Sequence, residues 1–369
     1  CRGERMRIEA REIHPITMTL RTPMPMSNGV IESTGNVVVK LTTDEGVIGW
    51  GEGVEAPALT NQSQSDIVAD LEALRPLVLG SDPMRRTELW VRLMSGPGTG
   101  STAIGAIDIA VHDLVGRALG IPVHQLLGGA VRDHIPALTL VGSGDGPSDA
   151  DKLAEKHAQG FRWFKIKLGM AAPDVELGTL AKAVELVGDQ GVVCGDVNEG
   201  WDEREASRFL SQLDGSQIRF IEQPVGRNHR DALLRLAESS PVQLCADESA
   251  GSLAAVIGFA GTAVGGVSLK LIKHGGITGV MRGAAICAGG GLEINLAGKV
   301  IESSISAAAN LHCAAAMDRV GFGCSPANQG IVLDVSQNPV GLDAGVFTVP
   351  DGPGLGVEVD EGMLARLAG

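Results

Sequence analysis

The sequence predicts an α/β protein in which a parallel β-barrel of about 200 residues follows a smaller α+β domain. Two observations support this prediction. From about residue 135, short apolar runs alternate with helical stretches, which is typical of βαβ units and a parallel sheet. Before residue 120, strand signals come first and helical patterns follow them. The chain of 369 residues is long enough for two or three domains with cores of their own.

The first domain opens with strand patterns. Residues 6–22 alternate apolar and polar side chains, as a half-buried strand does. Residues 23–29, rich in Pro, Met, Ser, Asn and Gly, are interpreted as a mobile loop. Residues 36–52 contain a strand, an Asp-Glu-Gly turn and a second strand, which predicts a hairpin. Residues 103–119 carry apolar side chains at helical spacing and predict an amphipathic helix.

The barrel is predicted from residues 129–339, after a first domain over residues 1–128. Eight strands close a barrel, whereas an open doubly wound sheet is the alternative; no GxGxxG follows the first strand to support it. The tail, about residues 340–369, contains a stretch rich in Pro and Gly and is expected to return to the first domain. The strands are assigned to seven apolar runs and a weaker eighth near Val320: residues 137–142, 164–168, 191–196, 218–222, 242–247, 267–271 and 292–298.

Composition excludes several classes of protein. The net charge is −14, from 30 basic and 44 acidic residues, so the surface repels phosphate backbones and no nucleic-acid partner is expected. No tract of about 20 apolar residues is present, so no membrane span is expected. The six cysteines are scattered and form no CxxC pair, which indicates buried reduced thiols in a cytoplasmic protein and argues against cysteine-ligated zinc.

Charged side chains end five consecutive apolar runs, each about one βα unit after the last. A single charged residue at a strand end is usually only solvated. Five in succession indicate a site, because the carboxyl ends of all barrel strands open on one face, the barrel mouth. The set comprises three lysines and three carboxylates: Lys165, Lys167, Lys270, Asp196, Glu222 and Asp247.

The three carboxylates predict a metal site. A set without His or Cys offers only hard oxygen ligands, which select Mg²⁺, with Mn²⁺ as an alternative, over Zn²⁺. We therefore predict that Asp196, Glu222 and Asp247 hold one Mg²⁺.

The lysines predict proton transfer. Lys165 and Lys167 are two residues apart on one strand, so both point into the mouth. Lys270 follows a strand four places further round and approaches from the opposite side. A neighbouring cation and Mg²⁺ lower the pKa of a lysine and permit a neutral amine base. Two bases on opposite faces of a carbon α to a carboxylate would racemise or epimerise it through an enediolate that the metal stabilises.

The same residues carry a family resemblance, which extends over nearly the whole chain. It resembles the enolase superfamily and, within it, the muconate lactonizing enzyme subgroup of the mandelate racemase/muconate lactonizing enzyme family. The matching motifs are Phe164-Lys165-Ile166-Lys167, Gly195-Asp196-Val197-Asn198, Ile221-Glu222-Gln223-Pro224, Ala246-Asp247-Glu248-Ser249, Leu269-Lys270 with Gly275-Gly276, Ala106-Ile107-Asp108-Ile109-Ala110, Leu126-Leu127-Gly128-Gly129, Glu302-Ser303 and Pro353-Gly354-Leu355-Gly356-Val357.

The resemblance implies a modified TIM barrel, (α/β)₇β, with an N-terminal α+β capping domain and a homo-oligomeric assembly. It also implies metal ligands at Asp196, Glu222 and Asp247. By the same resemblance Lys167 and Lys270 are the acid/base residues, and Lys165 neutralises the carboxylate of the substrate.

Departures from the family pattern bear on the substrate. Residues 320–324 read Val-Gly-Phe-Gly-Cys, where dipeptide epimerases of the subgroup carry Asp-x-Asp and muconate cycloisomerases have a Glu near Cys324. Residues 143–145, Ser-Gly-Asp, are cycloisomerase-like. Mandelate racemase itself has a His–Asp pair in place of the second lysine, so Lys270 argues against that enzyme.

Three functions follow from these observations. The main prediction is a Mg²⁺-dependent racemase or epimerase acting on a small carboxylic acid or amino-acid derivative. The alternative is a muconate-type cycloisomerase or a syn-dehydratase that uses the same enolate. A non-catalytic binding barrel is least favoured, because all three carboxylates and all three lysines are present.

Further residues are assigned around the mouth. Asn198 and Glu248 are expected to orient the metal ligands, and Glu302 either lines the mouth or lies at a helix N-terminus. Lys273, three residues after Lys270, is expected to point away and be solvated, and His274 is placed in a loop without a role.

Substrate specificity is expected to come from first-domain loops that close over the mouth, residues 23–33 and 54–62. Within them we single out Met24, Met26 and Ser27, because methionine offers flexible apolar contacts.

Overall fold

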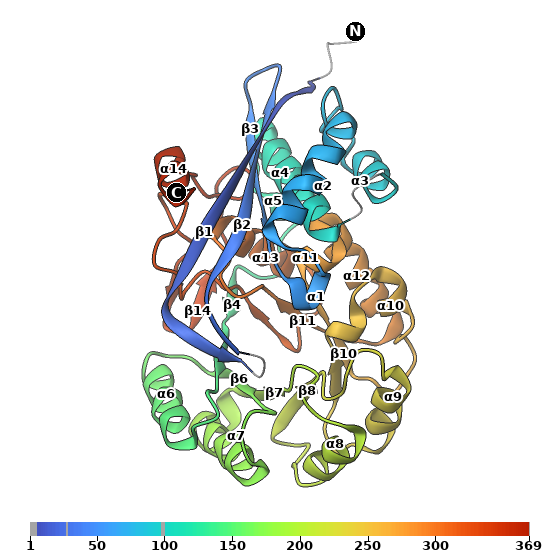
Figure 1. Ribbon diagram of the computed structural model, residues 1–369, viewed down its shortest axis with the longest axis vertical. Coiled ribbons are helices and arrows are strands. Elements are labelled where there is room, and N and C mark those ends of the chain that lie inside the picture. Colours follow the sequence, from blue (N-terminus) through green and yellow to red (C-terminus); the bar gives the residue numbers. More distant parts are fainter. Residues whose placement is uncertain (1–5, 27–28, 97–99, 369) are drawn as a thin grey trace.

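The computed structural model describes residues 6–26, 29–96 and 100–368 (Figure 1). An antiparallel sheet and a group of helices form one end of the molecule, and a parallel barrel surrounded by helices forms the other (Figure 1). None of the described helices is both long and apolar enough to cross a membrane.

The N-terminal sheet contains β1 (Ile8–Met26), β2 (Gly29–Thr43) and β3 (Ile48–Val54) in that order. The predicted strand and the predicted hairpin are both present, the hairpin as β2–β3. The interpretation of residues 23–29 as a loop is wrong for the described residues, because β1 continues to Met26 and Met24 pairs with Ile31. A register shift between Thr19 and Met24 and the edge position of β1 accommodate the prolines there.

Five described helices follow this sheet, and the fourth is the helix predicted at residues 103–119. It is not amphipathic as predicted, because every residue from 102 to 116 is buried between the sheet and the barrel helices that pack on it. This helix lies against β3, and the contact leaves no room for a side chain at Gly51. A Cβ on Gly51 would lie 1.9 Å from the carbonyl oxygen of Ala106. The buried Asp113 carboxylate accepts hydrogen bonds from the backbone N–H groups of Trp50 (2.9 Å) and Leu355 (2.8 Å), so one side chain joins the sheet, the helix and the C-terminal tail. The five helices are α1 (Pro57–Thr60), α2 (Gln64–Val78), α3 (Arg86–Met94), α4 (Ser101–Leu119) and α5 (Val123–Leu126).

The barrel consists of eight parallel strands that follow one another in chain order, and a bridge between Ala137 and Cys324 joins its two ends. This order confirms the predicted barrel and excludes the open doubly wound sheet. The eighth strand begins at Gly323, slightly later than predicted. The strands are β5 (Leu138–Val141), β6 (Trp163–Lys167), β7 (Val192–Asp196), β8 (Ile218–Glu222), β9 (Leu244–Ala246), β10 (Gly266–Leu269), β11 (Glu293–Ala297) and β12 (Gly323–Ser325).

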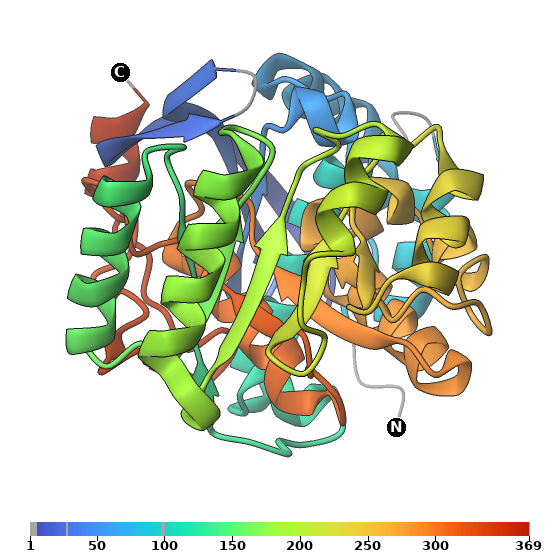
Figure 2. The ribbon, with the colours of Figure 1, turned by 90° about the horizontal axis from the view of Figure 1, so that it is seen from below.

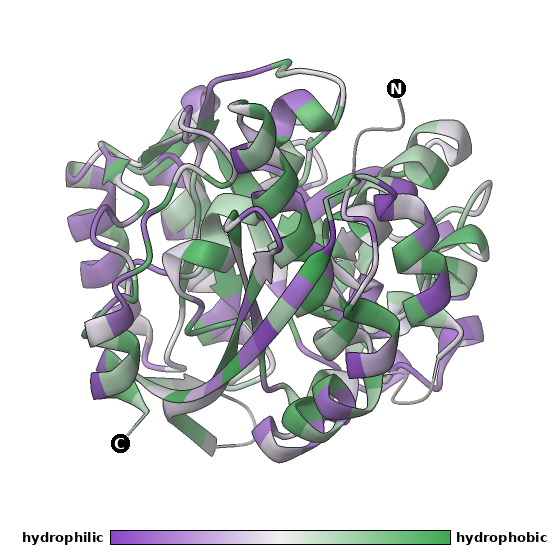
Figure 3. Ribbon diagram, turned by 90° about the horizontal axis from the view of Figure 1, so that it is seen from above, coloured by the Kyte–Doolittle hydropathy of each residue, from purple (hydrophilic) through white to green (hydrophobic). Residues whose placement is uncertain are grey.

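At least one helix joins each strand to the next, which gives the expected (α/β)₇β arrangement. These helices lie outside the barrel (Figure 2) and mix hydrophilic and hydrophobic residues along their length (Figure 3), as helices with one buried face do. The helices are α6 (Gly146–Ala158), α7 (Pro173–Val187), α8 (Glu203–Leu210), α9 (Arg230–Ser239), α10 (Leu253–Ile257), α11 (Leu271–His274), α12 (Gly276–Gly290) and α13 (Ser304–Ala316).

The C-terminal tail contacts both parts of the molecule. Its hairpin, β13 (Leu342–Asp343) and β14 (Val346–Thr348), adds to β4 (His134–Pro136) beside the barrel. Its helix α14 (Glu361–Leu367) packs against β1. The division into domains at residue 128 stays a prediction. The five described cysteines are buried and free, as expected.

Gly51→Ala should lower the free energy of unfolding by about 1–3 kcal/mol, because the added methyl group overlaps the backbone of α4. Urea denaturation measures the effect. Gly178→Ala in α7 is the matched control: nothing lies within 4 Å of its added Cβ, so this variant should keep or slightly raise stability. Equal stability of the two variants would contradict the close α4–β3 contact.

Candidate active site

A cavity of about 580 Å³ lies at the barrel mouth, under the N-terminal domain. The barrel contributes charged side chains, including Lys165, Lys167 and Lys270. The other domain contributes mainly apolar groups, among them Leu20 and Met24. The cavity therefore has a charged floor and a largely apolar cover.

The structure brings the predicted lysines and carboxylates together as ion pairs. Lys167 Nζ lies 2.8 Å from Asp196 Oδ2 and also donates to Asn198 Oδ1. Lys270 Nζ lies 2.5 Å from Asp247 Oδ2.

Lys165 pairs with Glu222, whose other carboxylate oxygen accepts hydrogen bonds from Ser268 Oγ and from Asn295 Nδ2 (3.1 Å). Ser268 and Asn295 were missed at the sequence level. They stand on predicted strands, and Ser268 lies two residues before Lys270, a spacing that would have placed its side chain inside the barrel.

The prediction that Lys273 is solvated is wrong. Its side chain is 1% exposed, and its ammonium group donates to Asp247 Oδ1 (2.7 Å), to the carbonyl oxygen of Asp247 (2.7 Å) and to that of Ser268 (2.8 Å). The strand ends at Leu269 and α11 begins at Leu271, so residues three apart lie on one side rather than on opposite sides. Asp247 is thereby held between two ammonium groups.

His274 likewise belongs to α11 and is buried, so its placement in a loop is wrong. Its Nδ1 lies 3.0 Å from the carbonyl oxygen of Lys270. Burial, together with the charge of Lys273, lowers the pKa of His274 to about 3, so its imidazole is neutral near pH 7.

Opposed effects of burial and charge set the pKa of the lysines. Burial lowers the pKa of Lys165, but attraction to Glu222 and Asp196 outweighs burial and raises it above its usual range. Burial also lowers the pKa of Lys270, but attraction to Asp247 outweighs burial and raises it above its usual range. The sequence predicts a lowered lysine pKa, whereas the pKa of both lysines is raised here. A lowered pKa requires another cation that offsets the negative charge of the neighbouring carboxylates.

Glu248 shows that the site has an excess of negative charge. Burial, and then repulsion by Asp247 and Asp196, raises the pKa of Glu248 to about 8. Its Oε1 accepts a hydrogen bond from Asn198 Nδ2 (3.2 Å), while its buried Oε2 has no partner among the described residues. An oxygen without a partner and a donor set of carboxylates fit a divalent cation.

The carboxylates come from neighbouring strands, and Asp196 of β7 and Glu222 of β8 are register partners. Among residues 6–26, 29–96 and 100–368, no three His, Cys, Asp or Glu side chains are gathered closely enough to hold a metal ion. Lysine ammonium groups stand between the carboxylates instead, as the ion pairs above describe.

Glu302 is buried beside the cavity rather than exposed in it. It precedes Ser303, the N-cap of α13, and its Oε1 accepts a hydrogen bond from the backbone N–H of Lys299 (2.7 Å). Burial raises the pKa of Glu302 to about 8. Lys299 itself lines the cavity, and sequence reasoning missed it. It lies two residues after the end of the seventh barrel strand, much as Lys270 directly follows its own strand, so a search of strand ends for charged residues would have found it.

The predicted specificity segments lie at the cavity where the structure describes them. Met24 lines it, Met26 ends β1, and Ser27 lies outside the described residues. Residues 55–59 also line the cavity. Arg227 of the barrel binds Glu199 and donates to the carbonyl oxygen of Ala58 (2.8 Å), which ties the barrel to this segment.

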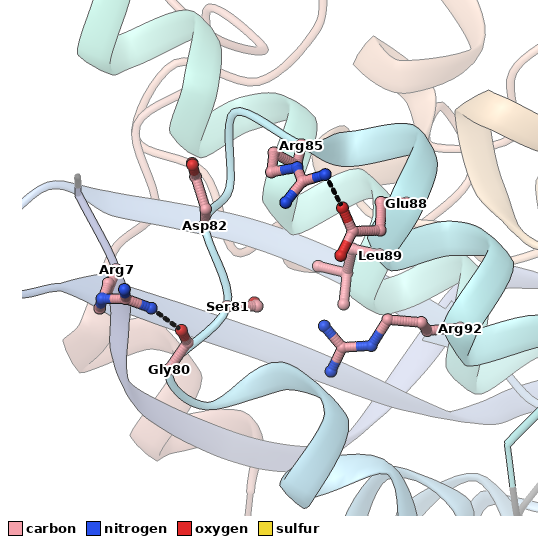
Figure 4. Close-up of a pocket in the computed structure, with 8 residues that line it drawn as sticks. All are labelled: Arg7, Gly80, Ser81, Asp82, Arg85, Glu88, Leu89 and Arg92. Carbon is pink, nitrogen blue, oxygen red and sulfur yellow. Dashed lines mark hydrogen bonds and ion pairs between the residues drawn. The ribbon is translucent and has the colours of Figure 1, made fainter. Parts of the chain in front are cut away.

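A smaller pocket of about 210 Å³ lies in the N-terminal domain, near the start of β1 (Figure 4). Its arginines have partners within the protein: Arg7 donates to the carbonyl oxygen of Gly80 (2.7 Å), and Arg85 pairs with Glu88 (2.6 Å). None of the predicted site residues lines it, so we place the candidate active site at the barrel mouth. The pocket is lined by Arg7, Gly80, Ser81, Asp82, Arg85, Glu88, Leu89 and Arg92.

Comparison with known proteins identifies the family. Residues 7–128 match the mandelate racemase/muconate lactonizing enzyme N-terminal domain, and residues 149–363 match the enolase C-terminal domain-like family. The chain therefore belongs to the mandelate racemase/muconate lactonizing enzyme family of the enolase superfamily. Its relatives make it an isomerase, and enzymes of this family generally use a divalent metal ion.

Individual relatives span the whole chain. A chloromuconate cycloisomerase from Pseudomonas putida is 34% identical over 97% of this chain and 98% of its own. An N-succinyl-L-Arg/Lys racemase from Bacillus cereus is 29% identical, with 98% of each chain covered. The crystal structure of muconate lactonizing enzyme from Pseudomonas fluorescens complexed with muconolactone has a TM-score of 0.92 and 28% identity, covering 99% of this chain and 100% of that one.

Lys273→Met should lower the free energy of unfolding by about 3 kcal/mol or more, because it removes one partner of a buried ion pair and the ammonium group that donates to the carbonyl oxygens of Asp247 and Ser268. Lys182→Met is the control, since its pair with Glu185 is exposed and should contribute less than about 1 kcal/mol. Urea denaturation of both variants tests the burial of Lys273, and equal losses would contradict it.

Proposed function

We propose that the protein is a metal-dependent cycloisomerase of the muconate type, which closes an unsaturated dicarboxylate to a lactone through an enolate. The observation that carries the proposal is the set of ion-paired lysines and carboxylates at the barrel mouth, of which Asp247 is buried against Lys270 and the others line one cavity: Lys165, Lys167, Lys270, Asp196 and Glu222. No acidic residue lines the cavity among the described residues after β12, so that side offers no partner for a substrate ammonium group. The same segment lacks the Glu that muconate cycloisomerases have near Cys324, so it argues against a cationic substrate end but does not by itself select the cycloisomerase. The chloromuconate cycloisomerase relatives support a cycloisomerase over a racemase.

In this proposal Asp196, Glu222 and Asp247 hold one Mg²⁺, and Glu248 lies beside them. The metal, when bound, supplies positive charge that stabilises the enolate oxygens. With Mg²⁺ held there, the carboxylates that now pair with Lys165, Lys167 and Lys270 would be shared with a second cation. Weaker attraction to Glu222 and Asp247 would lower the pKa of Lys165 and Lys270 and so ease proton transfer by these lysines.

The chain's own residues then guide the reaction. Lys165 neutralises the carboxylate whose α-carbon becomes the enolate. An oxygen of the other carboxylate adds to the carbon–carbon double bond, and the electron pair moves to the α-carbon. One of Lys167 and Lys270 donates a proton to that carbon, and no atom is lost. The apolar cover, including Leu20 and Met24, keeps water from the enolate.

Racemisation is the second candidate, and one observation favours it. Lys167 lies on β6 and Lys270 follows β10, four strands further round the barrel, so two bases reach the cavity from different sides. The N-succinyl-L-Arg/Lys racemase relative supports this second candidate.

Calorimetric titration should detect one Mg²⁺ per chain, and chelation should abolish activity reversibly. Glu222→Gln should weaken Mg²⁺ binding by at least about tenfold, since it removes a charged oxygen ligand. Glu185→Gln removes an exposed carboxylate and should leave binding unchanged. Unchanged binding in Glu222→Gln would remove the metal site from the proposal.

Wild-type enzyme given cis,cis-muconate in D₂O should form a lactone that carries one deuterium at the α-carbon, as mass spectrometry and NMR would show. Of the two variants Lys167→Ala and Lys270→Ala, the one that removes the proton donor should lower kcat by about 10²–10⁴. Deuterium exchange into both enantiomers of an α-substituted acid, with no lactone from muconate, would favour the racemase instead. Full turnover by both variants would overturn either mechanism.

A further inference from the structure

Lys299 is a cavity lysine to which the mechanism above gives no role. It comes two residues after the end of β11 and lines the same cavity as Lys167 and Lys270. These two lysines also act electrostatically on it, which places it near the reacting groups.

The charge of Lys299 is not matched as the other charges are. Lys165, Lys167 and Lys270 each pair with a carboxylate. Among the residues that the structure describes, none accepts a hydrogen bond from the ammonium group of Lys299 or forms an ion pair with it. Burial, with repulsion by Lys270, lowers the pKa of Lys299 to about 8, so most of it carries its charge at pH 7.

The nearby carboxylates do not compensate that charge fully. Burial raises the pKa of Glu302 to about 8, so this side chain is largely protonated and neutral at pH 7. Glu55 attracts Lys299 electrostatically but forms no ion pair with it among the described residues; its two carboxylate oxygens accept hydrogen bonds from the backbone N–H groups of Gly35 (2.6 Å) and Gln64 (3.2 Å). The ammonium group of Lys299 is therefore available to an anion that enters the cavity.

The loop that carries Lys299 is held rigidly. Ile301 has a φ of 69°, a left-handed conformation that is costly for a β-branched residue. The N-terminal domain stabilises it: Asn36 Nδ2 donates to the carbonyl oxygen of Ile301 (2.9 Å), and Glu52 accepts from Ser303 Oγ (2.8 Å). Lys299 thus starts from a fixed backbone, which limits the entropy lost when it binds a ligand.

Two of the positively charged side chains that line the cavity, Lys165 and Lys299, come from separated strands of the barrel. Lys165 stands on β6 and Lys299 follows β11, and β5 and β12 lie between these strands on the shorter way round the barrel. Apolar side chains line the cavity as well, among them Leu138 of β5 and Leu20 and Ile31 of the N-terminal domain. This arrangement matches a molecule with a carboxylate at each end and a short apolar chain between them.

We propose that Lys299 binds the second carboxylate of the substrate, the one whose oxygen closes the ring, and so determines specificity for dicarboxylates. The inference rests on the proposed function for the identity of that carboxylate. Lys299 contributes no proton in this role; it holds the attacking group and raises the affinity for a doubly charged substrate.

Binding of adipate and hexanoate to the Mg²⁺-loaded protein tests the inference. These six-carbon acids differ by one carboxylate and have no double bond, so neither can react. Calorimetry should show that wild type prefers adipate, and that Lys299→Met reduces this preference by about 10-fold to 100-fold while hexanoate affinity is kept. Lys299→Arg should keep much of the preference because it retains the charge.

Lys156→Met is the matched control, since it removes a positive charge from the same cavity but from α6, where the ammonium group lies 4.7 Å from the Phe161 ring centroid. It should leave the preference for adipate unchanged. An equal loss in Lys156→Met, or an unchanged preference in Lys299→Met shown by urea denaturation to be folded, would overturn the inference. If Lys299→Met fails to fold, the ratio of adipate affinity to hexanoate affinity is compared between Lys299→Arg and wild type. A complete loss of the adipate preference in Lys299→Arg would then overturn the role of Lys299 in binding the second carboxylate.

The two proposals fail separately. A wild-type enzyme that makes no lactone from muconate, but loses its adipate preference through Lys299→Met, keeps the binding role and loses the cycloisomerase. A wild-type enzyme that makes lactone while Lys299→Met binds both acids in the wild-type ratio keeps the cycloisomerase and loses the role of Lys299.

Discussion

Charge compensation at the barrel mouth is the constraint on which the rest of the site depends. Asp196, Glu222 and Asp247 are buried, and a buried carboxylate is costly unless cations and donors surround it. Lysines on β6, after β10 and in α11 provide those cations. One oxygen of Glu248, which has no partner among the described residues, marks where the compensation falls short. A divalent cation at that place would balance the charge and free the lysines for chemistry, so stability and function depend on the same set of groups.

The N-terminal domain does more than cover this set. Asp113 of α4 holds β3 and the C-terminal tail, and Glu52 of β3 holds the start of α13. Asn36 of β2 fixes the strained Ile301. Buried polar contacts therefore connect the sheet directly to the loop that carries Lys299. Since cavity-lining residues come from both parts, the shape offered to a substrate depends on how the two parts are joined.

The relatives show that this fold serves more than one reaction. Relatives that cover nearly the whole chain include both cycloisomerases and a racemase, so the scaffold supports more than one use of an enolate. Two segments of the cavity lining bear on the charge of the substrate, the one after β12 and the one after β11. The former lacks acidic residues among those that line the cavity, and the latter presents Lys299. Both features favour an anionic over a cationic substrate end.

The sequence by itself determined the barrel and six charged residues at its mouth, because strand alternation and strand-end positions repeat at regular intervals along the chain. It did not determine the burial of Lys273. Three residues after Lys270, a side chain points away from Lys270 in a strand but to the same side in a helical turn, and only the tertiary structure showed that β10 ends before this point. It also missed the strand at Met24, where pairing with β2 overrode a local composition typical of loops. The surroundings of Glu248 and Lys299 were decided by the tertiary structure alone, because burial and the field of neighbouring charges arise from residues distant in the chain.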